Sequence, residues 1–190
     1  MRKIRLYISM SLDGYIADKN GDVSWLSGHG QDEENIDTYS EFIKNVDTVI
    51  MGWNTYHQIV TELSPQEWVY ADLKSYVITH RNWSVSKDTT FTEEDITFTE
   101  EDITFTSEPP CQLAENLRSG EGKDIWICGG AEIVRQLMER DMIDVYHIAV
   151  MPTILGGGIR LFGEMKEEKK LRMIDTQSYN GIIETVYERR

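Results

Sequence analysis

The sequence is poor in the residues that mark a disulfide-stabilised or zinc-binding protein. Only Cys111 and Cys128 are present among 190 residues, and neither belongs to a CxxC motif or a Cys/His cluster. This spacing argues against a disulfide framework or a zinc site, so we expect no bound metal and a reducing, cytoplasmic location. The four histidines are scattered and show neither HExxH spacing nor a Ser/His/Asp order, which disfavours a metalloprotease or a serine hydrolase.

Basic charge is also scarce. The chain has 19 Lys and Arg against 33 Asp and Glu, a formal net charge of -14, and no Lys/Arg cluster. Such a surface repels phosphate backbones and anionic lipids, so we expect no nucleic-acid and no membrane partner. The apolar stretch near the N-terminus is interrupted by Ser9, Ser11 and Asp13. It is too short and too polar for a signal peptide or a membrane span.

Apolar periodicity predicts strands that alternate with helices. The length and a hydrophobic content of 40% suit one domain over residues 1–190. The patterns predict strands over 4–10, 46–51, 75–79, 124–128 and 145–151, helices over 32–45, 55–60 and 131–140, and a strand or hairpin within 173–188 around Asn180-Gly181. We therefore expect an α/β fold: a mostly parallel sheet with helices on both faces and an antiparallel C-terminal edge.

An exact tandem repeat interrupts this regularity. The segment Phe91–Thr97, FTEEDIT, is followed at once by an identical copy, Phe98–Thr104. Two seven-residue copies are too short and too few for a solenoid. A local duplication that lengthens an exposed acidic segment is favoured over a calcium site, because the glycine and ligand spacing of an EF-hand are absent.

Two junctions between a strand and a helix carry glycine. Gly129-Gly130 follows one apolar strand, and Gly52, with Asn54 and Thr55, follows another. Backbone N–H groups at such a helix start attract phosphate, although a Gly-Gly pair can equally serve a tight turn. Two junctions on parallel strands converge at one sheet edge, which favours a dinucleotide. Neither a GxGxxG fingerprint nor a P-loop is present, so the predicted nucleotide site is of another type.

Four motifs occur in an order that resembles a known family. They are MSLDGYIA at 10–17, VIMG at 49–52 with Thr55-Tyr56, ICGGAE at 127–132, and PTILGGG at 152–158 followed by Leu161-Phe162. Together they resemble the dihydrofolate reductase-like superfamily, and most closely the reductase domain of bifunctional riboflavin-biosynthesis enzymes and its stand-alone relatives. The HxE and PCxxC elements of the deaminase half are missing.

The resemblance implies a dihydrofolate reductase-like three-layer fold, an NADPH-dependent reductase and a homodimer, with NADH as a second cofactor option. It implies that the cofactor contacts Ile16, Ala17, Gly52, Trp53, Asn54, Thr55, Thr79, His80, Arg81, Gly129, Gly130, Ala131 and Glu132. Many relatives carry Arg where this chain has Trp53, and His80 or Arg81 can replace that charge.

Substrate contacts are predicted from the first loop and the first helix. Helical spacing puts Asp32 on the side of the apolar stripe and Asp37 nearly opposite, so Asp32 is the better pocket residue. Asp13, Trp25 and Tyr56 are further candidates, each with surface packing or capping as an alternative role. The sequence identifies no catalytic proton donor.

These features predict a reductase that transfers a hydride from NADPH to a small heterocyclic substrate, either a pterin or a ribosylated aminopyrimidine. The alternative is a catalytically silent dinucleotide-binding protein that acts as a sensor or binding module.

Overall fold

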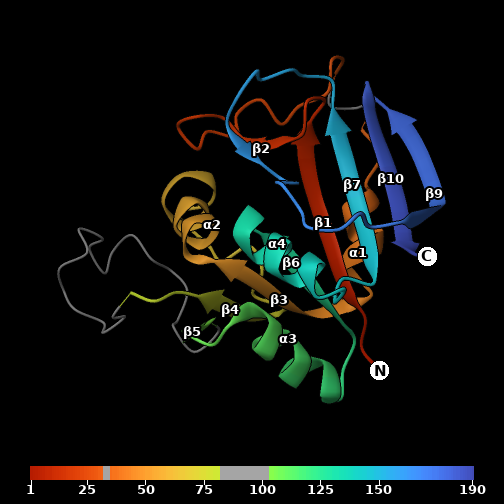
Figure 1. The fold of residues 1–190 in the computed structure, drawn as a ribbon. Coiled ribbons are helices and arrows are strands. Elements are labelled where there is room, and N and C mark those ends of the chain that lie inside the picture. The colour runs from red at the N-terminus through yellow and green to blue at the C-terminus, as the bar shows by residue number, and fades with distance from the viewer. Residues whose placement is uncertain (32–34, 82–102) are drawn as a thin grey trace.

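The computed structural model describes residues 1–31, 35–81 and 103–190 (Figure 1). The described strands are β1 (Ile4–Ser11), β2 (Tyr15–Ala17), β3 (Val46–Gly52), β4 (Lys74–Ile78), β5 (Ile103–Thr106), β6 (Asp124–Gly129), β7 (Val145–Met151), β8 (Ile159–Arg160), β9 (Leu171–Tyr179) and β10 (Ile182–Arg189). The α-helices are α1 (Thr38–Ile43), α2 (Trp53–Gln58), α3 (Pro110–Ser119) and α4 (Ala131–Glu139), and a π-helical turn, η2 (Ile59–Leu63), extends α2.

Eight strands form one sheet in the order β5-β4-β3-β6-β1-β7-β10-β9. Neighbouring strands from β5 to β7 are parallel, whereas β10 is antiparallel to both β7 and β9. The C-terminal hairpin turns at Asn180-Gly181, as the sequence predicted, and both residues have positive φ. The predicted fold class, an α/β sheet with an antiparallel C-terminal edge, is confirmed.

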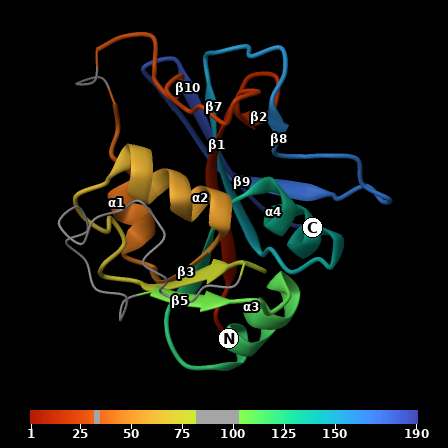
Figure 2. The ribbon, with the colours of Figure 1, turned by 90° about the vertical axis from the view of Figure 1, so that its left-hand side faces the viewer.

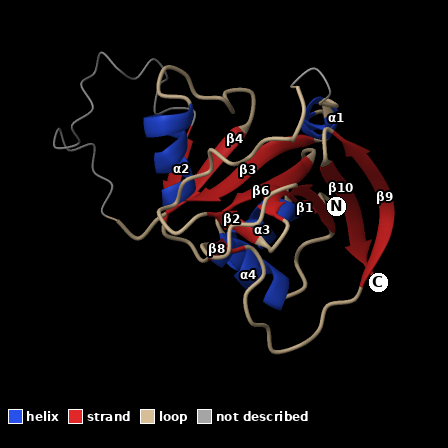
Figure 3. Cartoon of the chain, turned by 90° about the horizontal axis from the view of Figure 1, so that it is seen from above, coloured by secondary structure: helices blue, strands red, loops and turns tan. Residues whose placement is uncertain are grey.

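Helices cover both faces of the sheet (Figures 2 and 3). On β3, Ile50 belongs to the core beneath α3 and α4, while Val49 and Met51 belong to the core beneath α1 and α2. Trp126 on β6 likewise joins the second core, and its neighbour Ile127 joins the first. Because successive side chains of a strand point to opposite faces, β-branched and aromatic residues in a continuous run bury both faces. Each such side chain contributes about 1.5–3 kcal/mol by burial.

The helix predicted over 131–140 is confirmed as α4, with Ile133, Val134, Leu137 and Met138 buried on one face. Three other features differ from what the sequence predicted. The first helix begins at Thr38 rather than at residue 32, because Asp37 is its N-cap and accepts a hydrogen bond from the Ser40 amide at 2.9 Å. The helix α3, which buries Cys111, Leu113 and Ala114, was not predicted, and neither was β5.

Among the described residues, no helix is both long enough and apolar enough to cross a membrane. In the same part of the chain, no group of three or more His, Cys, Asp or Glu side chains is placed to hold a metal ion.

Candidate cofactor and substrate site

A crevice opens where two central strands separate. β1 pairs with β6 only from Ile4 to Leu6, opposite 125–127, although both strands continue. The carbonyl of Tyr7, the next residue, accepts a hydrogen bond from the indole Nε1 of Trp126 at 3.1 Å instead of a strand partner. Ligands of open α/β sheets bind at the carboxyl ends of the strands. The separation therefore provides the floor of a ligand site.

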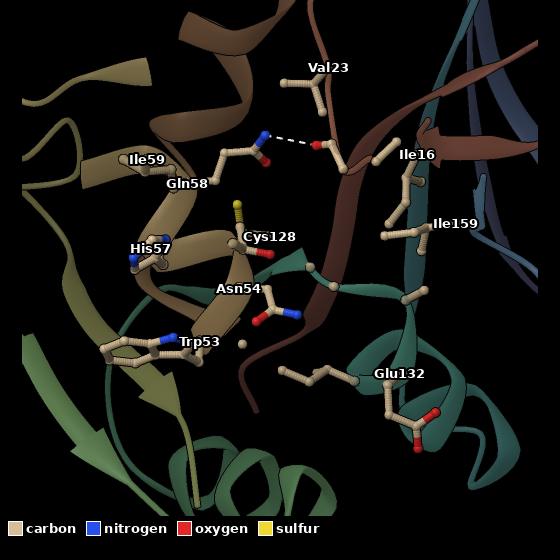
Figure 4. A pocket seen from close by; sticks show the side chains of 18 of the residues that line it. Ile16, Val23, Trp53, Asn54, His57, Gln58, Ile59, Cys128, Glu132 and Ile159 are labelled. Carbon is tan, nitrogen blue, oxygen red and sulfur yellow. Dashed lines mark hydrogen bonds between the residues drawn. The ribbon is translucent and has the colours of Figure 1, made fainter. Parts of the chain in front are cut away.

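The cavity at this edge has a volume of about 1490 Å³. Its walls come from the carboxyl ends of β1, β4 and β6, the starts of α2 and α4, and the segment from β2 to Leu26 (Figure 4). Pockets that hold one small ligand usually measure about 300–1,000 Å³. This cavity therefore has room for a dinucleotide with a second molecule beside it.

Two helix N-termini face the cavity without a side-chain cap. Gly52 is the N-cap of α2 and Gly130 that of α4, and neither helix start receives a side-chain hydrogen bond. Gly129 has φ 142°, a backbone conformation that L side chains rarely adopt, and its peptide bond to Gly130 is cis. Uncapped first-turn amides and the positive end of the helix dipole favour a bound anion. The chemistry of these junctions suits phosphate.

The segment after β2 closes one side of the cavity. The side-chain amide of Gln58 on α2 donates to the carbonyl of Gly21 at 2.8 Å, which ties this segment to the opposite wall. Strand β2 pairs with β8, and a Cβ at Gly158 would lie only 2.1 Å from the carbonyl oxygen of Ala17. Glycine is required at Gly158 for β8 to approach β2, and this approach holds Ile16 and Ile159 together on the cavity wall.

At the other end of the cavity, an arginine lies over a tryptophan. The Cζ atom of Arg81 is 5.1 Å from the centroid of the Trp53 ring, within the range of a cation–π interaction. The Arg81 amide also donates to Thr79 Oγ1 at 3.1 Å. A guanidinium is therefore present at this end of the site, beside an indole that carries no charge of its own.

The acidic side chain at the start of α4 is held by an ion pair. Arg135 donates from Nε and from an Nη atom to the two carboxylate oxygens of Glu132, at 2.9 Å and 2.5 Å. These hydrogen bonds lower the pKa of Glu132. The ion pair balances a negative charge that would otherwise weaken phosphate binding at this helix start.

The thiol of Cys128 lies at the centre of the cavity wall and is un-ionised. Its Sγ is 3.8 Å from the hydroxyl of Tyr70, and burial raises its pKa to about 11. Burial also raises the pKa of Tyr70. A nucleophilic cysteine needs a lowered pKa, so Cys128 contributes shape and polarity rather than a nucleophile.

All of the predicted cofactor residues lie along this cavity. The walls include Ile16, Ala17, Gly52, Trp53, Asn54, Thr55, Thr79, His80, Arg81, Gly129, Gly130, Ala131 and Glu132. The sequence reasoning missed Tyr7, Gln58, Tyr70 and Cys128 on the same walls. The alternation in the first strand put Tyr7 on a defined face of the sheet. Nothing in the sequence near Tyr7 indicates that β1 separates from β6 at this residue and so opens the cavity beside it.

The predicted substrate residues that the structure describes, unlike the predicted cofactor residues, lie away from the cavity walls. Asp13 accepts from the Ser11 hydroxyl and from the amides of Leu155 and Gly156, and so anchors the loop before β8; these bonds lower its pKa. Trp25 donates to the carbonyl of Asp22 and packs against a small apolar cluster formed by Ala149, Met151 and Ile182.

Tyr56, 6% exposed, is inside the second core. Of these three described residues, none lines the cavity. Their predicted contact with substrate has no support from the geometry, and Asp32 lies outside the described residues.

This sheet order, with a crevice between β1 and β6 and two glycine junctions at its edge, defines a dihydrofolate reductase-like α/β domain. The sequence profile of the RibD C-terminal domain matches residues 2–186. The chain belongs to this family, and membership supports a reductase-type role.

The chain is also similar to individual proteins over nearly its whole length. The chain is 36% identical to the uncharacterized protein YwjB of Bacillus subtilis, covering 99% of this chain and 98% of that one. A solved structure from Shewanella sp. PV-4, named for riboflavin biosynthesis, has a TM-score of 0.78 and 26% identity, covering 99% of both chains.

A second solved structure is that of the Thermotoga maritima diaminohydroxyphosphoribosylaminopyrimidine deaminase/5-amino-6-(5-phosphoribosylamino)uracil reductase. It shares the fold at a TM-score of 0.68 and 15% identity, and the match covers all of this chain but 57% of the bifunctional one.

Proposed function

We propose that this chain is an NADPH-dependent reductase that acts on a carbonyl or imine group of a small heterocyclic substrate. The observation that carries the proposal is the meeting of two uncapped helix starts, at Gly52 and Gly130, on one cavity of about 1490 Å³. When bound, the cofactor would supply a hydride to the substrate carbon.

The residues present suit NADPH. The amides that follow Gly130 would hold the pyrophosphate, and those that follow Gly52 would hold the adenosine end. Ile16 and Ala17 on β2 would border the nicotinamide and exclude water from it. Arg81, oriented by Trp53, would bind the additional phosphate that distinguishes NADPH from NADH.

The substrate would occupy the rest of the cavity, beside Asn20, Gln58 and Tyr7. The pterin and the ribosylated aminopyrimidine both carry ring nitrogens and carbonyls that side-chain amides bind. The similarity to the Thermotoga maritima protein, a 5-amino-6-(5-phosphoribosylamino)uracil reductase, favours the ribosylated aminopyrimidine. The free state of both cysteines is compatible with a cytoplasmic location.

The test is NADPH oxidation, followed by absorbance, after addition of dihydrofolate or the ribosylaminopyrimidine to the purified protein. Consumption that requires one of them supports the reductase. Tight NADPH binding without consumption of either would favour the silent binding protein instead.

The homodimer also remains a proposal. Exposed apolar side chains gather on the C-terminal strands, with Met173 and Ile174 on β9 and Ile183 on β10, each about half exposed. A second copy that covers them would double the mass measured by light scattering, and Ile174→Glu would return the chain to a monomer. A monomeric wild-type chain would contradict this assignment.

A further inference from the structure

A buried carboxylate lies below α1, outside the set of predicted site residues. Glu184 on β10 is 3% exposed, and its Oε2 accepts hydrogen bonds from the hydroxyls of Thr38, at 2.8 Å, and Tyr179, at 3.0 Å. Within the described part of the chain, none of the ion pairs includes Glu184. Burying a carboxyl group without a cation is costly, and an apolar residue would fill this place more cheaply. Packing alone therefore gives no reason for a carboxyl here.

The hydrogen bonds continue from Glu184 to the cavity. The hydroxyls of Thr38 and Tyr7 are 2.9 Å apart, and Tyr7 lines the cavity at the point where β1 leaves β6. Glu184 is in register with Ala149, whose small side chain leaves room for the carboxyl group to reach Thr38. We call the hydrogen-bonded series Glu184, Thr38 and Tyr7 the Tyr7 chain.

The Tyr7 chain can carry a proton in either direction without moving its heavy atoms. A threonine hydroxyl has one proton and two lone pairs, so it accepts from one neighbour while it donates to the other. With Glu184 ionised, Tyr7 donates to Thr38 and Thr38 donates to Glu184. With Glu184 protonated, both donations reverse, and the Tyr7 proton is free to point to another acceptor.

We propose that the Tyr7 chain delivers the proton that completes substrate reduction, with Tyr7 as the catalytic acid and Glu184 as the proton reservoir. The inference rests on the proposed function. The C=O or C=N carbon receives hydrogen and its bonding electron pair from the dihydronicotinamide, and the π pair moves to the oxygen or nitrogen. That atom takes the Tyr7 proton, Tyr7 takes that of Thr38, and Thr38 takes that of Glu184, which leaves an alcohol or amine and an ionised Glu184.

The surroundings allow Glu184 to take up a proton again after each turnover. Tyr179 on β9, which donates to Glu184, is only half-buried. Burial raises the pKa of Tyr7 to about 12, so Tyr7 is protonated between turnovers. His147 on β7 packs against the Tyr7 ring and is uncharged, because burial lowers its pKa to about 4. The remaining charges near His147 are Arg5 on β1 and Asp175 on β9.

Substitutions at Thr38 test the Tyr7 chain without changing a residue that lines the cavity. Thr38→Val removes the hydroxyl at nearly constant volume and should lower kcat about 100-fold at unchanged KM, as loss of acid catalysis does. Thr38→Ser keeps the hydroxyl and should retain activity. Tyr7→Phe and Glu184→Gln should resemble Thr38→Val, whereas Tyr39→Phe, which alters a ring packed on Tyr7, should not.

A readout without turnover separates the two proposals. In the protein alone, the ¹³Cζ NMR signal of labelled Tyr7 should shift as Glu184 titrates, in the wild type and in Thr38→Ser but not in Thr38→Val. An unchanged Tyr7 signal in the wild type overturns the proposed role of the Tyr7 chain, whether or not the protein binds NADPH. A wild-type level of kcat in Thr38→Val also overturns it and leaves the reductase intact. A failure to bind NADPH, seen by titration, overturns the proposed function and the acid role of Tyr7 with it.

Discussion

The guanidinium of Arg81 lies over the indole of Trp53, with 5.1 Å between Cζ and the ring centroid. The ring face attracts the cation and holds it at the end of the cavity where α2 begins. The aromatic residue thus orients a charge carried by another element, although it cannot itself form the bidentate contact of an arginine.

Arg81→Ala should weaken NADPH binding about tenfold, because a charge-assisted hydrogen bond to phosphate is lost. NADH, which lacks that phosphate, should bind about as before. Calorimetric titration with both nucleotides measures the difference. Arg172→Ala on β9, far along the sheet from the cavity, is the matched control and should change neither affinity. Equal weakening for both nucleotides would show that Arg81 does not bind the additional phosphate of NADPH.

Gly130→Val should abolish dinucleotide binding and leave the fold intact. A Cβ here would be 3.7 Å from Thr55 Oγ1, an ordinary contact, but the branched methyl groups would extend toward the place of the pyrophosphate. Circular dichroism checks the fold and tryptophan quenching checks binding. Gly163→Val, at a glycine with open space around it, is the control. Unchanged affinity in Gly130→Val would remove the pyrophosphate from this junction.

Acid should destabilise the protein through His147. Its pKa lies near 4 in the fold and 6.5 in the unfolded chain, so the unfolded state binds the proton more readily. The stability that neutral His147 contributes is therefore complete above pH 6.5 and is lost as pH falls toward 4. Allowing for its partial exposure to water, we expect a loss of about 2 kcal/mol.

Urea unfolding at pH 7 and pH 4.5 measures this loss in the wild type and in His147→Phe. The phenylalanine variant should lose less stability over the interval, because its side chain does not titrate and, within the described residues, the buried His147 Nε2 has no hydrogen-bond partner to lose. Equal pH dependence in both proteins would assign the loss to other groups.

Deleting one copy of the repeat, residues 91–97, should change neither thermal stability nor nucleotide affinity by much. Removing either copy yields the same chain, which retains the β5 sequence ITFT with the same residues before it. The repeat, apart from Ile103 and Thr104, lies outside the described residues. By contrast, Ile103→Ala should cost about 2–4 kcal/mol, because this side chain is buried. A deletion as costly as Ile103→Ala would show that the second copy is needed.

The parts of the fold that followed from the sequence are those governed by local pattern. The apolar face of α4, the run from Val46 to Met51 and the turn at Asn180-Gly181 are each specified by neighbouring residues. The glycine junctions could be predicted for the same reason, since a strand, a glycine and a helix adjoin in the sequence. The gathering of the predicted cofactor residues around one cavity followed from parallel strands that end at one edge.

The remainder depends on contacts between distant segments. Nothing near Tyr56 in the sequence indicates that its ring is enclosed by Trp68 and Phe105. Glu184 lies 146 residues from Thr38, and its environment exists only when α1 packs on the sheet close to β10. The early start expected for the first helix failed because an Asx cap at Asp37 competes with helical continuation.

The most direct test of the account is a titration of the purified protein with NADPH, followed by quenching of tryptophan fluorescence. Trp53 lines the cavity, so a bound nicotinamide dinucleotide should quench it. We predict saturable quenching by NADPH at lower concentration than by NADH, reduced in Arg81→Ala and lost in Gly130→Val. A titration with no saturable change for either nucleotide, confirmed by calorimetry, would contradict the assignment of this cavity as a cofactor site.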